Sequence, residues 1–119
     1  MEDLDGTYWE LVRLGEEMPV TGAGGRRIDG SFTDDPSPML YGFSGCNTYR
    51  SAYVTDGNQL SFGPGMSTMM ACPEGMDVEH RFLGMLEEVA SYRTTGGTLE
   101  LCNEAGATLA VFEAAERST

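Results

Sequence analysis

Lysine is absent from this sequence of 119 residues. All seven basic residues are arginine, against 19 aspartates and glutamates, and the formal net charge is -12. Proteins that bind DNA or RNA neutralise phosphates with clustered basic residues, so we expect no nucleic acid partner. The same charge argues against docking on anionic lipid. The simplest consequence of the negative net charge is a well-solvated surface. The less favoured alternative is an acidic site that binds a cation or a basic ligand.

Long apolar runs are also missing. No window approaches the ~18 uninterrupted apolar residues of a membrane-spanning helix. The first five residues, MEDLD, are acidic and lack the apolar run of a signal peptide. A trimmed leader would leave the same start, so this feature does not decide the compartment. We expect no direct membrane span and a monomer.

Cysteine and histidine are scarce. Cys46, Cys72 and Cys102 allow at most one disulfide and one free thiol. No C-x-x-C pair suggests zinc or a redox dithiol. His80 is the one histidine, and it is expected on the polar side of a helix. A thiol–histidine pair with Cys46 is therefore not expected, and we expect no metal or cofactor.

Short runs of strand-forming residues separated by turn signals occupy most of the chain. Asp56-Gly57-Asn58 is the strongest hairpin signal, and Gly96-Gly97 gives a second one. In the first run, Trp9 and Leu11 share one face and Leu14 the other. The expected strands are 7–14, 27–33, 39–45, 48–55, 59–63, 91–95, 98–103 and 107–114, with a further strand at 68–72.

The periodicity changes after Pro73. Apolar residues then recur at three- and four-residue spacing, which predicts an amphipathic helix over 73–92 with Pro73 in its first turn. The fold class is therefore mainly β (α+β): a compact antiparallel, barrel-like twisted sheet with one amphipathic helix. Length predicts one domain, 1–119, with its core at about 7–114.

The stretch GFSGCNTYRSAY (42–53) breaks two strands at Gly45-Cys46-Asn47. Glycine allows positive φ, asparagine can bond its own backbone, and cysteine is small and readily buried, so we interpret this as a structural corner. Cys46 and Cys72 are then plausible neighbours, either packed or bridged, and Cys102 a lone thiol. A bridge closing a ~25-residue loop would add ~3–4 kcal/mol, so substituting either cysteine should lower thermal stability under oxidising conditions.

Two other segments suggest ligands less strongly. Met66, Met69, Met70 and Cys72, with Met76 beyond them, are soft ligands of the kind that select Cu(I), although methionine also serves as an adaptable core filler. The glycines of 22–25 lack the strand-to-helix context of a phosphate site and predict a flexible loop.

Together these motifs resemble the META domain, or HslJ-like, family of bacterial envelope proteins, over nearly the whole chain. The resemblance is carried in order by WEL (9–11), GFSGCNTYRSAY (42–53), LSFGP (60–64), STMMACP (67–73), E-x-x-F-L-x-x-L (79–86), Tyr92, LEL (99–101) and LAVFEA (109–114). The residues we take as its structural signature are Trp9, Gly45, Cys46, Asn47, Tyr49, Thr68, Met69, Met70, Cys72, Glu79, Phe82 and Leu86.

The resemblance implies a barrel similar in shape to the lipid-binding pilot proteins of secretion systems, with no enzymatic activity and no catalytic residues. It further implies a lipoprotein or secreted protein connected with heat shock and stress. We therefore expect a non-enzymatic envelope-associated or secreted binding module whose precursor reaches the periplasm, with the cytoplasm as the alternative.

The functional surface is expected at the apolar mouth of the barrel or on a face bearing Asn47, Tyr49 and Tyr53. Its partner would be a protein or an apolar small molecule. The alternative function is binding of a lipid-like ligand in the barrel interior, or of Cu(I) on the Met/Cys cluster.

Overall fold

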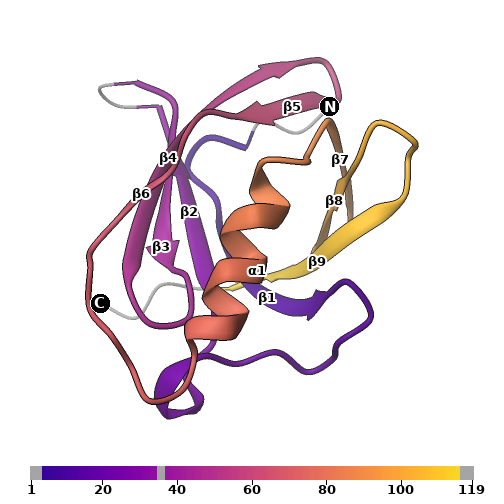
Figure 1. Cartoon of the computed structure of the whole chain (residues 1–119). Helices are drawn as coiled ribbons and strands as arrows, with labels where there is room; N and C mark the ends of the chain where they lie inside the picture. Colours follow the sequence, from indigo (N-terminus) through magenta and orange to yellow (C-terminus); the bar gives the residue numbers. More distant parts are fainter. Residues whose placement is uncertain (1–3, 35–36, 116–119) are drawn as a thin grey trace.

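Eight strands close into an antiparallel barrel in the computed structural model, which describes residues 4–34 and 37–115 (Figure 1). A ninth strand extends the wall, and one α-helix and one short 3-10 helix complete the fold. The elements are β1 (Tyr8–Leu14), η1 (Ala23–Gly25), β2 (Asp29–Thr33), β3 (Met39–Phe43), β4 (Thr48–Asp56), β5 (Gln59–Phe62), β6 (Met66–Ser67), α1 (Met76–Leu86), β7 (Ser91–Thr95), β8 (Thr98–Cys102) and β9 (Thr108–Ala114).

Around the barrel the strand order is β1-β2-β3-β4-β5-β7-β8-β9, and β9 pairs with β1 to close the ring. Consecutive strands joined by tight turns pair with each other, as expected where Gly57 and Gly96 adopt positive φ of 62° and 60°. The seam between β5 and β7 is weaker, since its register contains the single pair Gln59 and Ser91. Strand β6 and helix α1 both lie between these two strands along the chain.

Strand β6 continues the line of β5 along β4. The second half of β4 pairs with β5, whereas Tyr49 and Arg50, in its first half, pair with Ser67 and Met66 of β6. The break between the two partners falls at Gly63-Pro64-Gly65. Proline cannot donate to a ladder, so a break at this point is expected.

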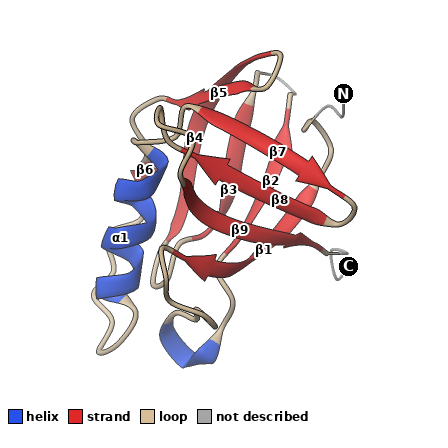
Figure 2. Ribbon diagram, turned by 90° about the vertical axis from the view of Figure 1, so that its right-hand side faces the viewer, coloured by secondary structure: helices blue, strands red, loops and turns tan. Residues whose placement is uncertain are grey.

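Alternate side chains of the strands fill the interior. In β4, Tyr49, Ser51 and Tyr53 are buried while the residues between them are exposed, because successive side chains point to opposite faces. Helix α1 lies against one side of the barrel (Figure 2). Its fully buried Phe82 makes edge contacts with Tyr49 of β4, at 5.3 Å between ring centroids, and with Phe112 of β9, at 6.3 Å. The helix thereby helps to fill the core.

The predicted fold class is confirmed, but three local predictions are wrong. Leu14 lies buried with Trp9 and Leu11 rather than on the opposite face. The register with β9 shifts between Leu11 and Arg13, and such a bulge adds one residue and reverses the alternation beyond it.

The helix begins at Met76, three residues after Pro73, because Gly75 takes a left-handed φ of 95° at its N-cap. It ends at Leu86, and Ser91 already belongs to β7.

The predicted strand at 68–72 is also wrong. Pairing with β4 stops at Ser67, and Met69 is 94 % exposed instead of lying on a strand face. Within the described residues, α1 is too short and too polar to cross a membrane.

Candidate functional site

The corner at Ser44–Asn47 rests on unusually close backbone packing. Gly45 has a φ of 134°, and a Cβ added there would lie 2.8 Å from the carbonyl oxygen of Gly75. A Cβ on Gly22 would lie 2.6 Å from the Cα of Gly45. The Gly45 carbonyl accepts a hydrogen bond from the backbone N–H of Ala23 at 2.7 Å. Three chain segments can therefore meet here only because glycines remove the side chains between them.

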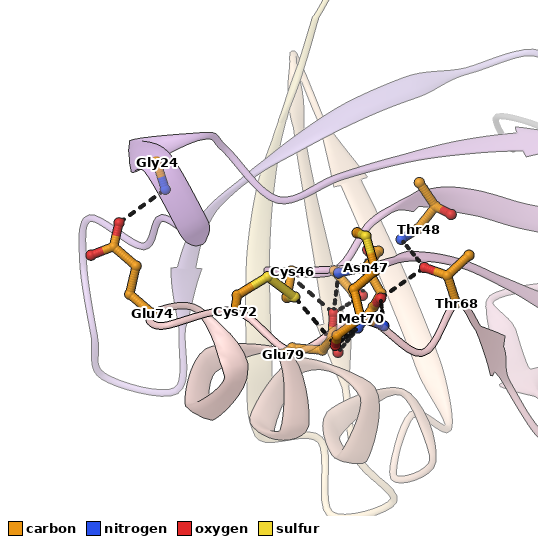
Figure 3. The surroundings of a disulfide bond; sticks show 10 residues. Gly24, Cys46, Asn47, Thr48, Thr68, Met70, Cys72, Glu74 and Glu79 are labelled. Atoms are coloured by element: carbon orange, nitrogen blue, oxygen red, sulfur yellow. Dashed lines mark hydrogen bonds between the residues drawn. A yellow bond between two sulfur atoms is a disulfide. The ribbon is translucent and has the colours of Figure 1, made fainter.

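Glu79 of α1 sends its carboxylate into this corner (Figure 3). Its Oε1 accepts hydrogen bonds from Ser44 Oγ at 2.7 Å, Cys46 N at 3.1 Å and Asn47 N at 2.6 Å. Its Oε2 accepts from Asn47 Nδ2 at 2.8 Å. We call Ser44, Cys46, Asn47 and Glu79 the Glu79 network. Only 3 % of Glu79 is exposed, so its carboxylate has little contact with water. The four donors of the corner provide the hydrogen bonds that water would otherwise provide.

The network determines the charge state of Glu79. Burial raises the pKa of Glu79, because it disfavours the charged form. Hydrogen bonds from Asn47, Ser44 and Cys46 outweigh that cost and leave its pKa below the ordinary value. Glu79 is therefore an anion that anchors the helix to the corner.

Asn47 carries the network onward to the segment 68–72. Its Oδ1 accepts from Thr68 Oγ1 and from Met70 N, both at 2.8 Å, and its Nδ2 also donates to Met70 O at 3.2 Å. Thr68 N still donates to Thr48 O of β4 at 3.1 Å, and beyond Thr68 the Asn47 side chain supplies backbone contacts at Met70. Asn47 is thus a structural link rather than an exposed binding group.

A disulfide joins Cys46 to Cys72, so of the two arrangements expected from the sequence, packed or bridged, the structure has the bridged one (Figure 3). It links the corner to the far end of the same segment, at a Cα–Cα distance of 6.0 Å. Cys102 is a free buried thiol in β8, as predicted. With both sulfurs bonded to each other, neither Cys46 nor Cys72 offers a nucleophile.

The structure brings most of the predicted signature together, but not all of it. Gly45, Cys46, Asn47, Thr68, Met70, Cys72 and Glu79 meet at the corner, with Met70 contributing its backbone. Tyr49, Phe82, Leu86 and Trp9 belong to the core. Met69 stands apart, because its side chain points into solvent.

The prediction of an exposed functional face bearing Asn47, Tyr49 and Tyr53 is wrong, because all three side chains are buried. Asn47, Tyr49 and Tyr53 are 2 %, 3 % and 6 % exposed and point inward. The Tyr49 hydroxyl donates to the carbonyl oxygen of Asp29 at 2.9 Å, and burial, with a smaller contribution from the charge of Asp29, raises the pKa of Tyr49. These groups are bound within the fold.

Three contributors were missed by reasoning from the sequence. Ser44, which is fully buried, and Gly75 complete the corner. The loop at 22–25 was predicted to be flexible, but it forms η1, and Gly24 N donates to Glu74 Oε1 at 3.0 Å (Figure 3). The signal available for these residues was their glycine and serine content, which does not reveal what they pack against.

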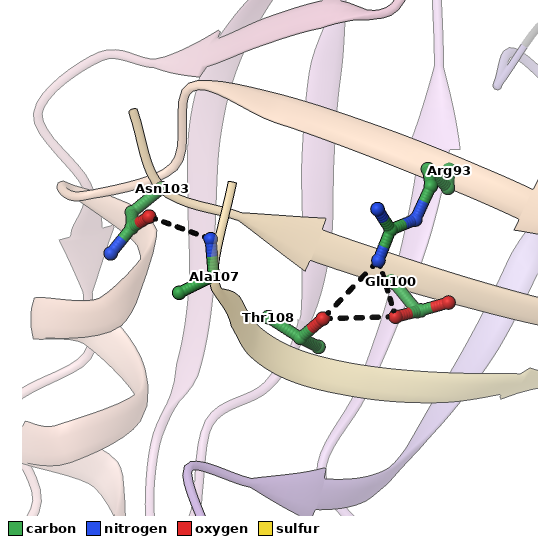
Figure 4. A network of polar contacts seen from close by, with 5 residues as sticks. All are labelled: Arg93, Glu100, Asn103, Ala107 and Thr108. Carbon is green, nitrogen blue, oxygen red and sulfur yellow. Dashed lines mark hydrogen bonds and ion pairs between the residues drawn. The ribbon is translucent and has the colours of Figure 1, made fainter. Parts of the chain in front are cut away.

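A second polar cluster lies on the outer side of β7, β8 and β9 (Figure 4). Arg93 Nη2 pairs with Glu100 Oε1 at 2.9 Å, and Thr108 Oγ1 donates to the same oxygen at 2.9 Å. The hydrogen bonds from Arg93 and Thr108 lower the pKa of Glu100. Asn103 Oδ1 accepts from Ala107 N at 3.0 Å in the adjoining turn. These contacts connect strands, and among the described residues no group of three His, Cys, Asp or Glu side chains could hold a metal ion.

Comparisons with known proteins agree with this architecture. A family model described as META domain matches residues 2–116. The chain is similar to a protein from Burkholderia xenovorans solved by NMR, at 26 % identity and a TM-score of 0.74 over 96 % of this chain and 85 % of that one. It is also similar in fold to a DUF4847 family protein from Bacteroides vulgatus ATCC 8482, solved by crystallography, at 13 % identity and a TM-score of 0.65 over 97 % and 96 % of the two chains. No curated protein matches the sequence.

Proposed function

Because this chain belongs to the META domain family, we propose that it is a non-enzymatic binding module that works in the cell envelope or outside the cell. The single observation that carries the proposal is the Cys46–Cys72 disulfide. Disulfides persist in oxidising compartments such as the periplasm and are rare in the reducing cytoplasm. The stress-related role implied by the resemblance is part of the same proposal.

The arrangement of the corner supports a binding role over catalysis. Groups that could perform chemistry are engaged in holding the fold: the two sulfurs are bonded to each other, and the carboxylate of Glu79 is surrounded by donors. His80, although it adjoins Glu79, is exposed. A rigid, cross-linked barrel of this kind suits the presentation of a surface to a ligand or partner.

The thiol state of the protein in its own cells tests the compartment. Cells are quenched in acid, free thiols are blocked with N-ethylmaleimide, and the protein is digested without reductant for mass spectrometry. We expect a linked peptide pair containing Cys46 and Cys72, and alkylation of Cys102 only after denaturation. The matched control is Cys72→Ser, which must remove the linked pair. Alkylation of both Cys46 and Cys72 in most of the protein would contradict the proposed compartment.

Binding of Cu(I) is a second candidate, favoured by one observation. Met66, Met69 and Met70 are 61 %, 94 % and 57 % exposed within five consecutive residues. Thioethers are soft ligands that prefer Cu(I). In the oxidised protein the bridged Cys72 contributes no thiolate, so the candidate depends on the methionines. Anaerobic calorimetric titration with Cu(I) tests it, and absence of heat in the wild type would remove it.

Binding of a lipid-like ligand in the barrel interior is the remaining candidate for the proposed binding function. The barrel interior holds the side chains of a continuous core that includes Phe82 and Leu60, so an apolar ligand there would have to displace them. A fatty-acid displacement assay separates this form from binding at the outer surface.

A further inference from the structure

A row of outward-facing side chains crosses five strands. Register places Tyr8 of β1 opposite Ser31 of β2, Ser31 opposite Tyr41 of β3, Tyr41 opposite Arg50 of β4, and Arg50 opposite Met66 of β6. Directly opposed residues on one face of a sheet lie within side-chain contact distance. The row therefore forms a continuous strip on the outside of the barrel.

A hollow accompanies this strip. It is an open groove of about 830 Å³, lined by the row and by residues beside it, among them Arg26, Phe43 and Thr48. Phe43 and Thr48 are register partners, and the Arg26 guanidinium carbon lies 4.2 Å from the centroid of the Phe43 ring. The volume is that of a small-molecule site. We call it the outer groove.

The charge of the outer groove differs from that of the rest of the molecule. Arg81 pairs with Glu17 and Asp77, and Arg93 with Glu100. Arg26 and Arg50, by contrast, form no ion pair with any residue in the described ranges. Arg26 lies over the Phe43 ring, and Arg50 contacts the Met66 sulfur at 4.0 Å.

One carboxylate also faces the groove, but neutral donors occupy it. Asp29 Oδ2 accepts from the Tyr8 hydroxyl at 2.6 Å, and Asp29 Oδ1 accepts from Phe43 N at 2.8 Å. Two guanidinium groups against one carboxylate leave a local positive charge on a protein whose net charge is -12. A concave surface of one sign concentrates ligands of the opposite sign.

We propose that the outer groove binds a compact organic anion with an aromatic or other planar body and one or two negative charges, carried by a carboxylate or a phosphate. Arg26 and Arg50 pair with the charged group, and Tyr41 and Tyr8 offer faces on which a ring can lie. The net charge of -12 disfavours large polyanions. This inference rests on the proposed function as a binding module and names its ligand class.

The test is a ¹⁵N NMR titration of the oxidised wild-type protein with four probes. Benzoate and phenyl phosphate carry a ring and a charge, benzyl alcohol carries the ring alone, and acetate carries the charge alone. We expect saturable shifts at roughly 1 mM for benzoate or phenyl phosphate, confined to amides of β2, β3, β4 and β6 and to those around Tyr8 and Arg26. Comparing the two ring anions decides between carboxylate and phosphate. Weaker or no saturation is expected with benzyl alcohol and acetate.

The matched variants are Arg26→Gln and Arg50→Gln, with Arg27→Gln as the control. Arg27 is exposed, carries the same charge and adjoins Arg26, but it does not line the groove. Each groove variant should bind about two- to fivefold more weakly, as expected for a partly exposed charge pair. The control should bind like the wild type, and its NMR spectrum also checks the fold.

Three results would overturn the inference: no saturable shift with either ring anion, an equal response to benzyl alcohol, or equal weakening in Arg27→Gln. Comparing the titrations of the wild type with the ring anions and with benzyl alcohol tests the inference even if a variant fails to fold. The outcome is also distinguishable from failure of the proposed function. Reduced cysteines in the cell would contradict the compartment but not the groove, and a groove without ligand would leave the disulfide result unchanged.

Discussion

At the position of Glu79, a carboxylate inside the fold faces four hydrogen-bond donors from Ser44, Cys46 and Asn47. Replacing it with an amide presents an NH₂ group where the corner also presents donors. Buried donors without an acceptor cost about 1–3 kcal/mol each, and losing a buried charged partner costs more.

We therefore expect Glu79→Gln to lower the free energy of unfolding by about 2–4 kcal/mol, measured by urea denaturation at neutral pH. Glu88→Gln, a change of the same chemistry at an exposed position near the end of the helix, should change it by less than about 0.5 kcal/mol. Equal stability of the two variants would mean that the network does not hold the corner.

The same residue predicts an acid sensitivity. A carboxyl group whose pKa is lower in the folded than in the unfolded protein stabilises the fold fully above its unfolded value, here near the ordinary 4.5. That contribution is lost as the pH falls through the lowered pKa. In the wild type, the unfolding free energy should therefore fall with pH below 4.5 more steeply than in Glu79→Gln. Parallel pH profiles would contradict this assignment.

Among the elements, the segment from Thr68 to Cys72 depends most on a cross-link. Cys46 and Cys72 are 26 residues apart, and the chain-entropy model gives such a bridge about 3.5 kcal/mol. The double variant Cys46→Ala/Cys72→Ala should be less stable than the wild type by about this amount in thermal and urea unfolding. Adding reductant should bring the wild type to the level of the variant, while Cys102→Ala should keep its response to reductant. Identical melting of the wild type with and without reductant would refute the stabilising role.

The strands were predictable from the sequence where period-two patterns end in turn glycines, as at Gly57 and Gly96. Prediction failed where tertiary contacts replace local rules. The segment around Met69 is ordered by the Asn47 side chain instead of a ladder, and the bulge after Leu11 depends on the register with β9. Strand propensity contains neither piece of information.

For the site, the corner and the possible disulfide were predictable, but the burial of Glu79 was not. Its neighbour His80 is exposed, and the donors around Glu79 come from 32 to 35 residues away. The outer groove was missed for a similar reason. Tyr8, Tyr41 and Arg50 belong to different strands, and only the pairing register aligns them.

For the whole molecule, the seam between β5 and β7 is the place where the barrel is most weakly closed. It has one register pair, supplemented by hydrogen bonds from Leu60 N to Ala90 O at 3.1 Å and from Tyr92 N to Asn58 O at 2.9 Å. Strand β8 pairs along its length with neighbours on both sides. Segments with fewer backbone bonds open more often.

We expect the amides of Leu60 and Tyr92 to exchange with solvent at least about tenfold faster than the bonded amides of β8, measured by hydrogen exchange and NMR. Both residues are buried, so exposure alone does not explain such a difference. Equal protection across the barrel would show that the seam opens only when the whole protein unfolds.

The pairing of the first barrel strand with the last has a consequence for synthesis. Register joins Trp9 to Ala114, so nearly the whole described chain separates the two partners. Contacts between residues so far apart in sequence form slowly, because a long loop must close first. A nascent chain that has not yet released β9 has no partner for one edge of β1. The ring therefore closes only once β9 has been synthesised and released from the ribosome, after the strands that precede it.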